Sequence, residues 1–524
     1  MPSSAYDDAV GATIRQTACK VILDLADMSA APDATLSASE QETTVSRLDE
    51  TINGNELVSP TQRWTTLEAG YFRLDGDNRI PPHPTQIISS DVGYWSESLS
   101  GDDGVLYEPI VITVDFSVHH SSLGLSLAFD NEYPLDFTVV WYGDEDAELA
   151  RVTVFENDTP FVMLDQIVDD YTKIVITFNT LRNANRRLRV YEIIFGVRQT
   201  FIDDQIISAS ITRELAVIDE VLPSSEFSFE LDNLDKRFNF LNPQGIYKYI
   251  QTKQLIKGFI GVYVNDTDIE YVNVGRYYMD EWETDGITAR FTGRDCLYFI
   301  SDSLQYTVSS TTTKTLKAWL ETLFAQAGID NYVIDDSLDS VSVATRWDAT
   351  SIKGLTKSAC TAGRCIIYVD VNNVVQIKPI DKRVVGTITA DNTYAFPKIN
   401  LDSKYNTVKV GVWSSSSNKV TSYVTVNNIE NNEEAITYEV ADNPFITSTT
   451  MATDVANYYL ALLSHREIYN IDWRQNPALD IADIVEVEDN FGVNGNVILT
   501  KQDYSYAGYL HGSSEGRGID VAAT

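Results

Sequence analysis

Short runs in which apolar and polar residues alternate make up most of the chain. In such a run every second side chain faces the same side, as in a β-strand with one buried face. Tyrosine, threonine and valine, which favour strands, are frequent in these runs. The first run spans residues 13–23, and Ala-, Ser- and Asp-rich sequence with Pro32 follows it. The pattern predicts a mainly β protein that begins with a strand and a linker over residues 1–35.

Residues 36–198 contain a series of candidate strands separated by Gly, Asp, Asn and Pro. The clearest of these strands are Ile110–Val118, Leu123–Phe129, Asp136–Tyr142, Ala150–Phe155, Thr172–Phe178 and Leu188–Phe195. Short strands with turn residues between them are typical of a jelly-roll β-sandwich. The sequence therefore predicts a sandwich domain over residues 36–198.

After residue 198 the pattern changes from strands to a mixed segment and then returns to strands. Residues 199–300 and 396–512 are predicted to form two β domains, and residues 301–395 a small α/β domain between them. Within the α/β segment, apolar residues recur at helical spacing from Leu316 to Ala327. Thr315 is in position to cap this helix and Gly328 to end it.

Two further helices are predicted, over residues 351–362 and 450–464. The Gly- and Ser-rich end of the chain, residues 513–524, is predicted to be a flexible tail.

The net charge narrows the choice of function. Lysine and arginine total 39 and aspartate and glutamate total 76, which gives a net charge of −37. Such a charge argues against sequence-independent binding to nucleic acid and against docking on an anionic membrane, because both depend on basic side chains. The sequence begins without a secretory signal, and no apolar run is long enough to cross a membrane. Four scattered cysteines do not make a disulfide framework, so we expect synthesis in a reducing cytoplasm.

No group of residues has the spacing of a catalytic or metal site. Residues 512–516 match the nucleophile pattern G-x-S-x-G, but the histidine that should follow is absent. Cys360 and Cys365 lack the second ligand pair that zinc requires. His119 and His120 end a strand as neighbours, so their side chains are expected to face opposite sides. We therefore predict no enzyme activity, no cofactor and no bound metal.

One short segment of this acidic chain is rich in positive charge. It contains Arg182, Arg186, Arg187, Arg189 and Arg198. One interpretation is structural: a loop and one strand on which the arginines face outward while Leu188, Val190 and Ile194 face inward. The alternative is a surface that binds an anionic glycan or an acidic neighbouring subunit. The structural interpretation is favoured.

A candidate sugar site lies in the predicted sandwich. Sugar sites combine an aromatic ring for stacking with carboxylates or amides for hydroxyl groups, on loops of a rigid scaffold. Tyr94 and Trp95 stand between turn-forming residues, and Asp102 and Asp103 follow closely. These four residues are the predicted glycan-binding site.

Three stretches of the sequence carry a resemblance to a known family. They are Leu231–Tyr247 (LDNLDKRFNFLNPQGIY), Gly275–Trp282 (GRYYMDEW) and Asn476–Val485 (NPALDIADIV). They resemble the tail hub, or tail-associated, proteins of phages of Gram-positive hosts and of related contractile bacteriocins. Residues 36–198, with Asp91–Ser96 and Val190–Gly196, resemble a discoidin-type carbohydrate-binding sandwich inserted in such a hub.

The resemblance implies two hub β-barrels separated by the α/β domain. Three copies would form a ring of pseudo-sixfold symmetry that joins the tail tube to the spike. The implied partners are two further copies, tube and distal tail or baseplate subunits, a spike or tip protein, and a host cell-wall glycan. The implied location is the virion tail or an extracellular tail-like particle assembled in the host cytoplasm, with DNA passing through the lumen without specific binding.

Two alternatives remain open at this point. One is a free cell-wall glycan-binding protein, which would need an export route. The other is a wall hydrolase whose site the sequence does not reveal.

Overall fold

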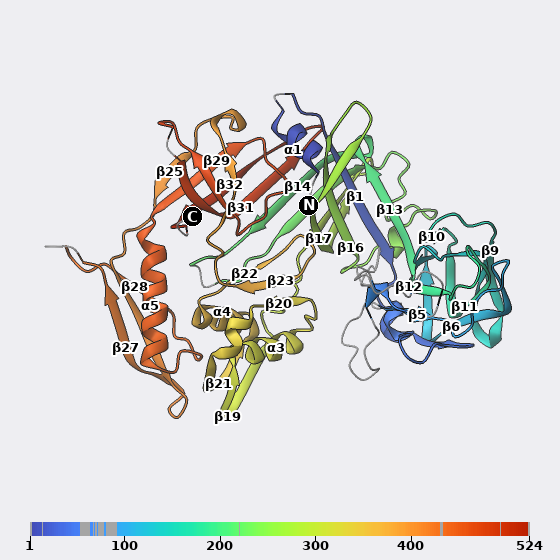
Figure 1. Ribbon diagram of the computed structural model, residues 1–524, viewed down its shortest axis with the longest axis horizontal. Helices are drawn as coiled ribbons and strands as arrows, with labels where there is room; N and C mark the ends of the chain where they lie inside the picture. The colour runs from blue at the N-terminus through green and yellow to red at the C-terminus, as the bar shows by residue number, and fades with distance from the viewer. Residues whose placement is uncertain are drawn as a thin grey trace. The chain divides into compact units, whose positions relative to one another are not determined.

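A computed structural model describes residues 3–12, 14–52, 63–66, 68, 71, 78–79, 92–218, 221–429, 433–492 and 494–521. The chain is mainly β and divides into two compact units (Figure 1). The small unit comprises Ile22–Thr200 and Lys236–Gln254, and the large unit comprises Met1–Val21, Phe201–Asp235 and Leu255–Thr524. Among the described residues, no helix combines the length and apolarity needed to cross a membrane.

The small unit is a β-sandwich, which confirms the prediction for this region. One sheet has the order β2 (Thr35–Ala38), β6 (Val105–Ser122), β11 (Val168–Leu181), β8 (Pro134–Tyr142) and β9 (Glu148–Val154). The other has the order β10 (Phe161–Leu164), β7 (Leu125–Phe129), β12 (Arg189–Ile194) and β5 (Tyr94–Trp95). The two-residue strands β3 (Arg63–Trp64) and β4 (Asn78–Arg79) pair separately.

Alternation along these strands builds the sandwich core. Ile174 and Ile176 of β11 stand opposite Val114 and Ile112 of β6, and all four are fully buried together with Leu127 of the facing sheet. Since apolar side chains from both sheets fill one interior, the sandwich has a core of its own.

Short elements complete the small unit: α2 (Ala30–Asp33), η1 (Asp49–Ile52), η3 (Asp144–Asp146) and η5 (Tyr247–Tyr249). The segment Lys236–Gln254, which was predicted to belong to the first β domain, is part of this unit. Gln254 fixes its end, because the side-chain Nε2 donates to the carbonyl oxygens of Ala26 at 2.8 Å and Tyr249 at 2.7 Å.

The large unit is built on a long, mainly antiparallel sheet. Its order is β13 (Gly196–Ile202), β1 (Thr17–Ala26), β16 (Leu255–Tyr263), β17 (Ile269–Thr284), β18 (Thr288–Arg294), β15 (Glu226–Asp232), β14 (Ile206–Glu214), β31 (Asn494–Tyr506), β32 (Leu510–Gly518), β29 (Glu467–Trp473) and β25 (Lys398–Leu401). Strand β30 (Ile484–Glu488) pairs with β31 and with β24 (Val384–Ile388). Strands β1 and β13 connect the two units along the chain.

The two predicted β domains are the two halves of this one sheet. They meet where β14 pairs with β31, from Ala209 opposite Tyr506 to Glu214 opposite Lys501 (Figure 1). A pairing between strands almost 300 positions apart leaves no local trace in the sequence, so alternation could not predict it.

The α/β region is larger than predicted. It contains α3 (Leu316–Ala327), α4 (Ile352–Gly363) and α5 (Thr449–Ser464), with η6 (Asp336–Ser340). Its strands are β19 (Gln305–Thr315) with β21 (Ser342–Ser351), β20 (Tyr332–Ile334) with β23 (Val375–Lys378) and β22 (Ile366–Val369), and β27 (Lys419–Asn427) with β26 (Thr407–Ser414) and β28 (Thr437–Glu439). The boundary predicted at residue 396 is wrong, because Val408, Val410 and Val455 share one core with Trp319 and Leu355.

The helix ends follow the sequence closely. The Thr315 hydroxyl accepts a hydrogen bond from the Ala318 N–H at 3.2 Å, and Gly328 ends α3 with φ 69°. At α4 the left-handed residue is Arg364, with φ 58°, and the helix ends at Gly363, one residue beyond the predicted range. The prediction omitted the N-terminal helix α1 (Ser4–Gly11) and placed the first strand four residues too early.

The predicted flexible tail is wrong over residues 513–518, which belong to β32. The G-x-S-x-G residues lie in this strand, between β29 and β31, rather than in a nucleophile elbow. The glycines of this motif allow neighbouring strands to approach closely. A Cβ on Gly512 would lie 2.0 Å from the Asp503 carbonyl oxygen, and one on Gly516 would lie 2.3 Å from a Val497 methyl group. The glycine content therefore reflects tight packing and not flexibility.

Candidate functional site

The aromatic pair of the predicted glycan site lies inside the sandwich. Tyr94 is 0% exposed and Trp95 is 4% exposed. The Tyr94 hydroxyl donates to the Glu40 carbonyl oxygen at 2.7 Å, and the Trp95 indole N–H donates to the Val92 carbonyl oxygen at 3.0 Å. A sugar cannot stack on a ring that has no exposed face. The stacking role predicted for these two residues is therefore wrong.

Trp95 instead covers a buried arginine. Its ring lies 4.5 Å from the Arg189 guanidinium, which forms ion pairs with Glu68 and, at 2.9 Å, with Asp130. Burial alone would lower the pKa of Arg189, but the Asp130 and Glu68 carboxylates raise it above its ordinary value. The charged guanidinium thus links strand β12 to the loops that carry Glu68 and Asp130.

The other arginines of this stretch also have partners within the small unit. Arg198 pairs with Asp24 at 2.7 Å, Arg186 with Glu132 at 3.3 Å, and Arg187 donates to the Ser96 carbonyl oxygen at 2.6 Å. The Arg182 guanidinium lies over the Tyr133 ring. These partners support the structural interpretation of the cluster, but the expectation that all its arginines face outward is wrong for Arg189, which is buried.

The predicted acidic pair occupies an exposed turn. Asp102 accepts a hydrogen bond from the Asn185 amide at 3.1 Å, and Asp103 accepts one from the Val105 N–H, also at 3.1 Å. Gly104 completes the turn with φ 83°. The structure thus separates the four predicted residues into a buried pair and an exposed turn, and it does not bring them together around one open site.

Other reactive side chains lie in the interior. Cys360 and Cys365 are buried and unpaired, and burial raises the pKa of each thiol to about 12. A thiol with such a pKa is protonated at neutral pH and is a poor nucleophile or metal ligand. The described residues contain no cluster of three or more His, Cys, Asp or Glu side chains suited to a metal ion.

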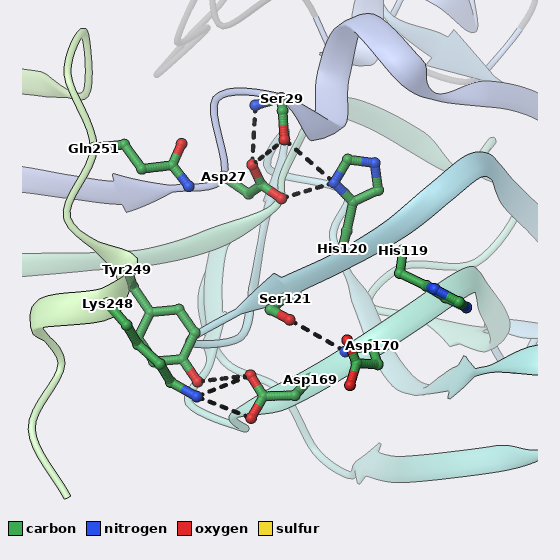
Figure 2. A pocket seen from close by; sticks show the side chains of 10 residues that line it. All are labelled: Asp27, Ser29, His119, His120, Ser121, Asp169, Asp170, Lys248, Tyr249 and Gln251. Carbon is green, nitrogen blue, oxygen red and sulfur yellow. Dashed lines mark hydrogen bonds and ion pairs between the residues drawn. The ribbon is translucent and has the colours of Figure 1, made fainter. Parts of the chain in front are cut away.

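The small unit contains a polar pocket that the sequence did not reveal (Figure 2). It is a cavity of about 540 Å³, and ten residues line it: Asp27, Ser29, His119, His120, Ser121, Asp169, Asp170, Lys248, Tyr249 and Gln251. They come from four separate segments: the turn after β1, the end of β6, the start of β11 and the segment around η5.

One wall of the pocket is organised by His120. Its Nδ1 lies 2.8 Å from Asp27 and its Nε2 lies 3.1 Å from Asp33, and the ring is buried. Asp27 also accepts from the Ser29 hydroxyl at 2.6 Å. Burial alone would raise the pKa of Asp27, but the hydrogen bonds from Ser29 and His120 outweigh it and lower the pKa below its ordinary value. His119 faces the other way, toward Asp144 at 3.0 Å, as the sequence predicted for adjacent residues of a strand.

The opposite wall is organised by Asp169. It accepts from the Lys248 ammonium at 3.0 Å and from the Tyr249 hydroxyl at 3.0 Å (Figure 2). Its neighbour Asp170 has φ 59°, and the Asp170 N–H donates to the Ser121 hydroxyl at 3.1 Å. The only sequence signal for this pocket was the histidine pair, because the remaining residues are common polar types on distant segments.

Comparison with known proteins gives weak likenesses only. No family model and no curated protein sequence matches the chain. Among solved structures, the chain is similar to a tail protein from Neisseria meningitidis MC58, with 11% identity, a TM-score of 0.43, and coverage of 61% of this chain and 93% of that one. A prophage MuSo2 43 kDa tail protein from Shewanella oneidensis gives 13% identity, a TM-score of 0.43, and coverage of 61% and 95%.

A second set of similar structures consists of carbohydrate-binding modules. The family 32 module of C. perfringens NanJ, solved with galactose, has 12% identity and a TM-score of 0.21. The match covers 34% of this chain and 99% of the module.

Proposed function

We propose that this chain is a structural hub protein at the end of a phage tail or phage-tail-like particle. In this role three copies form a ring that joins the tail tube to the distal spike. The sandwich is an accessory module that binds a host cell-wall glycan. The proposal assigns the chain no catalytic activity and no cofactor. Its location is the tail of a virion or of an extracellular tail-like particle.

The observation that carries the proposal is the long sheet of the large unit. Two strand-rich halves of this sheet meet at the pairing of β14 with β31, and the three stretches that resemble tail hub proteins begin beside or within its strands. Leu231 is in β15, Gly275–Trp282 is in β17, and Asn476–Val485 leads into β30. Two β halves in each of three copies would supply the six similar positions that a sixfold tube needs.

The edge of the sheet supports a contact between copies. Of the strands that the structure describes, β25 ends the order beyond β29, and none of its four residues is buried. Leu401 is 64% exposed and Ile399 is 41% exposed, and Phe396 just before the strand is 54% exposed. An edge strand with exposed apolar side chains is a liability in a free monomer, and a neighbouring subunit would cover it.

The net charge of −37 agrees with a lumen through which DNA slides. Acidic walls repel a phosphate backbone, so DNA would pass without being retained. A lumen lined mainly by lysine and arginine would contradict this part of the proposal.

The test is the mass of the particle in solution. The purified chain, alone and with the tube and distal tail subunits, should form trimers by analytical ultracentrifugation and threefold rings by negative-stain electron microscopy. A chain that stays monomeric under both conditions refutes the hub proposal. The free glycan-binding alternative predicts that monomer, together with binding to intact cell walls.

A further inference from the structure

We infer that the polar pocket of the small unit binds one neutral sugar residue. This inference deepens the glycan-binding part of the proposed function and rests on it. The site is distinct from the predicted aromatic pair, and its wall at residues 248–251 comes from outside the sandwich strands.

The pocket has the size and the mixed chemistry that a sugar requires. Its volume of about 540 Å³ falls within the ~300–1,000 Å³ range typical of small-ligand sites. It offers both kinds of group: the Gln251 amide can donate, and the carboxylates of Asp27, Asp169 and Asp170 can accept. Each sugar hydroxyl is both a donor and an acceptor, so it can use both kinds of group.

Most of the groups in the pocket are held in place before any ligand arrives. Asp169 is fixed by Lys248 and Tyr249, and Asp27 by Ser29 and His120. The Gln251 side-chain oxygen accepts from the Met28 N–H at 3.0 Å, which leaves the amide N–H₂ group to donate (Figure 2). Groups that are already oriented lose little conformational entropy on binding.

Charge selects a neutral ligand. Three carboxylates face one ammonium, that of Lys248, so an anionic sugar or a phosphate would be repelled. Burial alone would raise the pKa of Asp169, but the bonds from Lys248 and Tyr249 outweigh it and lower the pKa below its ordinary value. Asp169 is therefore ionised at neutral pH. An apolar ligand is disfavoured because Tyr249, the one Phe, Tyr or Trp among the ten lining residues, is only 6% exposed.

Asp170 lies at an irregularity in the pairing of β11 with β6. Its φ of 59° lies in the left-handed region, which costs free energy for a residue other than glycine. That conformation is held by the bond from the Asp170 N–H to Ser121. None of the described residues forms a hydrogen bond or an ion pair with the Asp170 carboxylate, so its oxygens are open to a ligand's hydroxyls.

The experiment is isothermal titration calorimetry on the full chain with four separate probes. They are glucose, galactose, N-acetylglucosamine and, as the anionic control, glycerol phosphate. At least one neutral sugar should bind with a millimolar dissociation constant, and glycerol phosphate should not. Absence of binding by all three sugars in the high millimolar range, or tighter binding of glycerol phosphate, overturns the inference.

Two variants place any binding in this pocket. Asp170→Asn removes an acceptor charge and tolerates the same backbone conformation, and Gln251→Ala removes a donor. Each should weaken sugar binding about five- to tenfold, the effect of one lost hydrogen bond. Asp103→Asn, in the exposed turn outside the pocket, is the matched control and should bind as the natural chain does. Binding that neither pocket variant weakens assigns the sugar to another site.

The outcome is separable from the hub proposal. A chain that forms trimers but binds no sugar keeps the hub role and loses this site. A monomeric chain that binds sugar loses the hub role and keeps the site.

Discussion

Asp295 is the best place to test the electrostatics of the large unit. It follows β18, is 1% exposed, and accepts hydrogen bonds from the backbone N–H groups of Ser225 at 2.5 Å and Tyr298 at 3.1 Å. Burial raises the pKa of this carboxyl group to about 6, against these hydrogen bonds, which lower it. Asp295 thus links β18 to the residues just before β15.

The size and sign of the effect follow from this pKa. The ordinary value is 3.8 and the folded value is about 6, and at ~1.4 kcal/mol per pH unit the difference corresponds to roughly 3 kcal/mol. A raised pKa means that the folded state binds the proton more tightly than the unfolded state. The stabilisation from Asp295 is therefore fully present below about pH 4 and is lost as the pH rises through about 6.

The perturbation is Asp295→Asn, which keeps the shape of the neutral carboxyl group and cannot ionise. Hydrogen exchange with mass spectrometry would report the opening free energy of peptides that contain the Ser225 and Tyr298 amides, at pH 4 and pH 7. The free energy of the variant minus that of the natural chain should rise by up to about 3 kcal/mol between these two pH values. The other titrating groups occur in both proteins and cancel in this difference.

A second substitution controls for surface charge. Asp285→Asn removes an exposed carboxylate in the turn between β17 and β18, where hydrogen bonds from Thr288 and Ile287 lower the pKa of the carboxyl group. Its difference from the natural chain should therefore fall slightly between pH 4 and pH 7, which is the opposite sign to Asp295→Asn. Parallel profiles for Asp295→Asn and the natural chain would refute the argument, because they would show that Asp295 ionises equally easily in both states.

Three further substitutions test other parts of the structure. Arg189→Met should destabilise the sandwich by ~3–5 kcal/mol, because it leaves two buried carboxylates without their counter-charge, and thermal unfolding would measure it. Leu401→Lys should abolish trimers in analytical ultracentrifugation without changing the monomer's far-UV spectrum, whereas Phe491→Lys, at an 83% exposed turn position, should keep them. Thr315→Ala should lower the opening free energy at the start of α3 by about 1 kcal/mol in hydrogen exchange, because an N-cap bond is lost.

Much of the fold could be predicted because its signals are local. Helix α3, for example, is predicted from a short stretch of sequence: the apolar spacing from Leu316, the N-cap at Thr315 and the glycine at Gly328. The sandwich strands likewise follow from alternation and turn residues. The pairing of β14 with β31, and the shared core of α5 with the α/β segment, depend on contacts between distant residues. No local pattern encodes them.

The predicted glycan site failed because local sequence does not determine whether a side chain is exposed. Tyr94 and Trp95 looked accessible because turn-formers flank them, yet a residue between turns can still point inward. Whether Trp95 is buried depends on its partner on the neighbouring strand. Trp95 pairs with Arg189, and the buried guanidinium of Arg189 is stabilised by carboxylates and by the Trp95 ring. An aromatic residue in a single sequence thus indicates burial or binding equally well.

The polar pocket could not be predicted, for a related physical reason. Asp27 and His120 lie 93 positions apart, and Asp169 and Lys248 lie 79 apart. A sugar needs several weak hydrogen bonds at once, and no one of them demands an unusual residue, so such a site leaves no motif. A catalytic nucleophile or a zinc site requires particular residue types at particular spacings, and for that reason sequence patterns can argue for or against an enzyme. The function of this sandwich therefore depends on geometry that only the folded chain displays, and the pocket variants test that geometry directly.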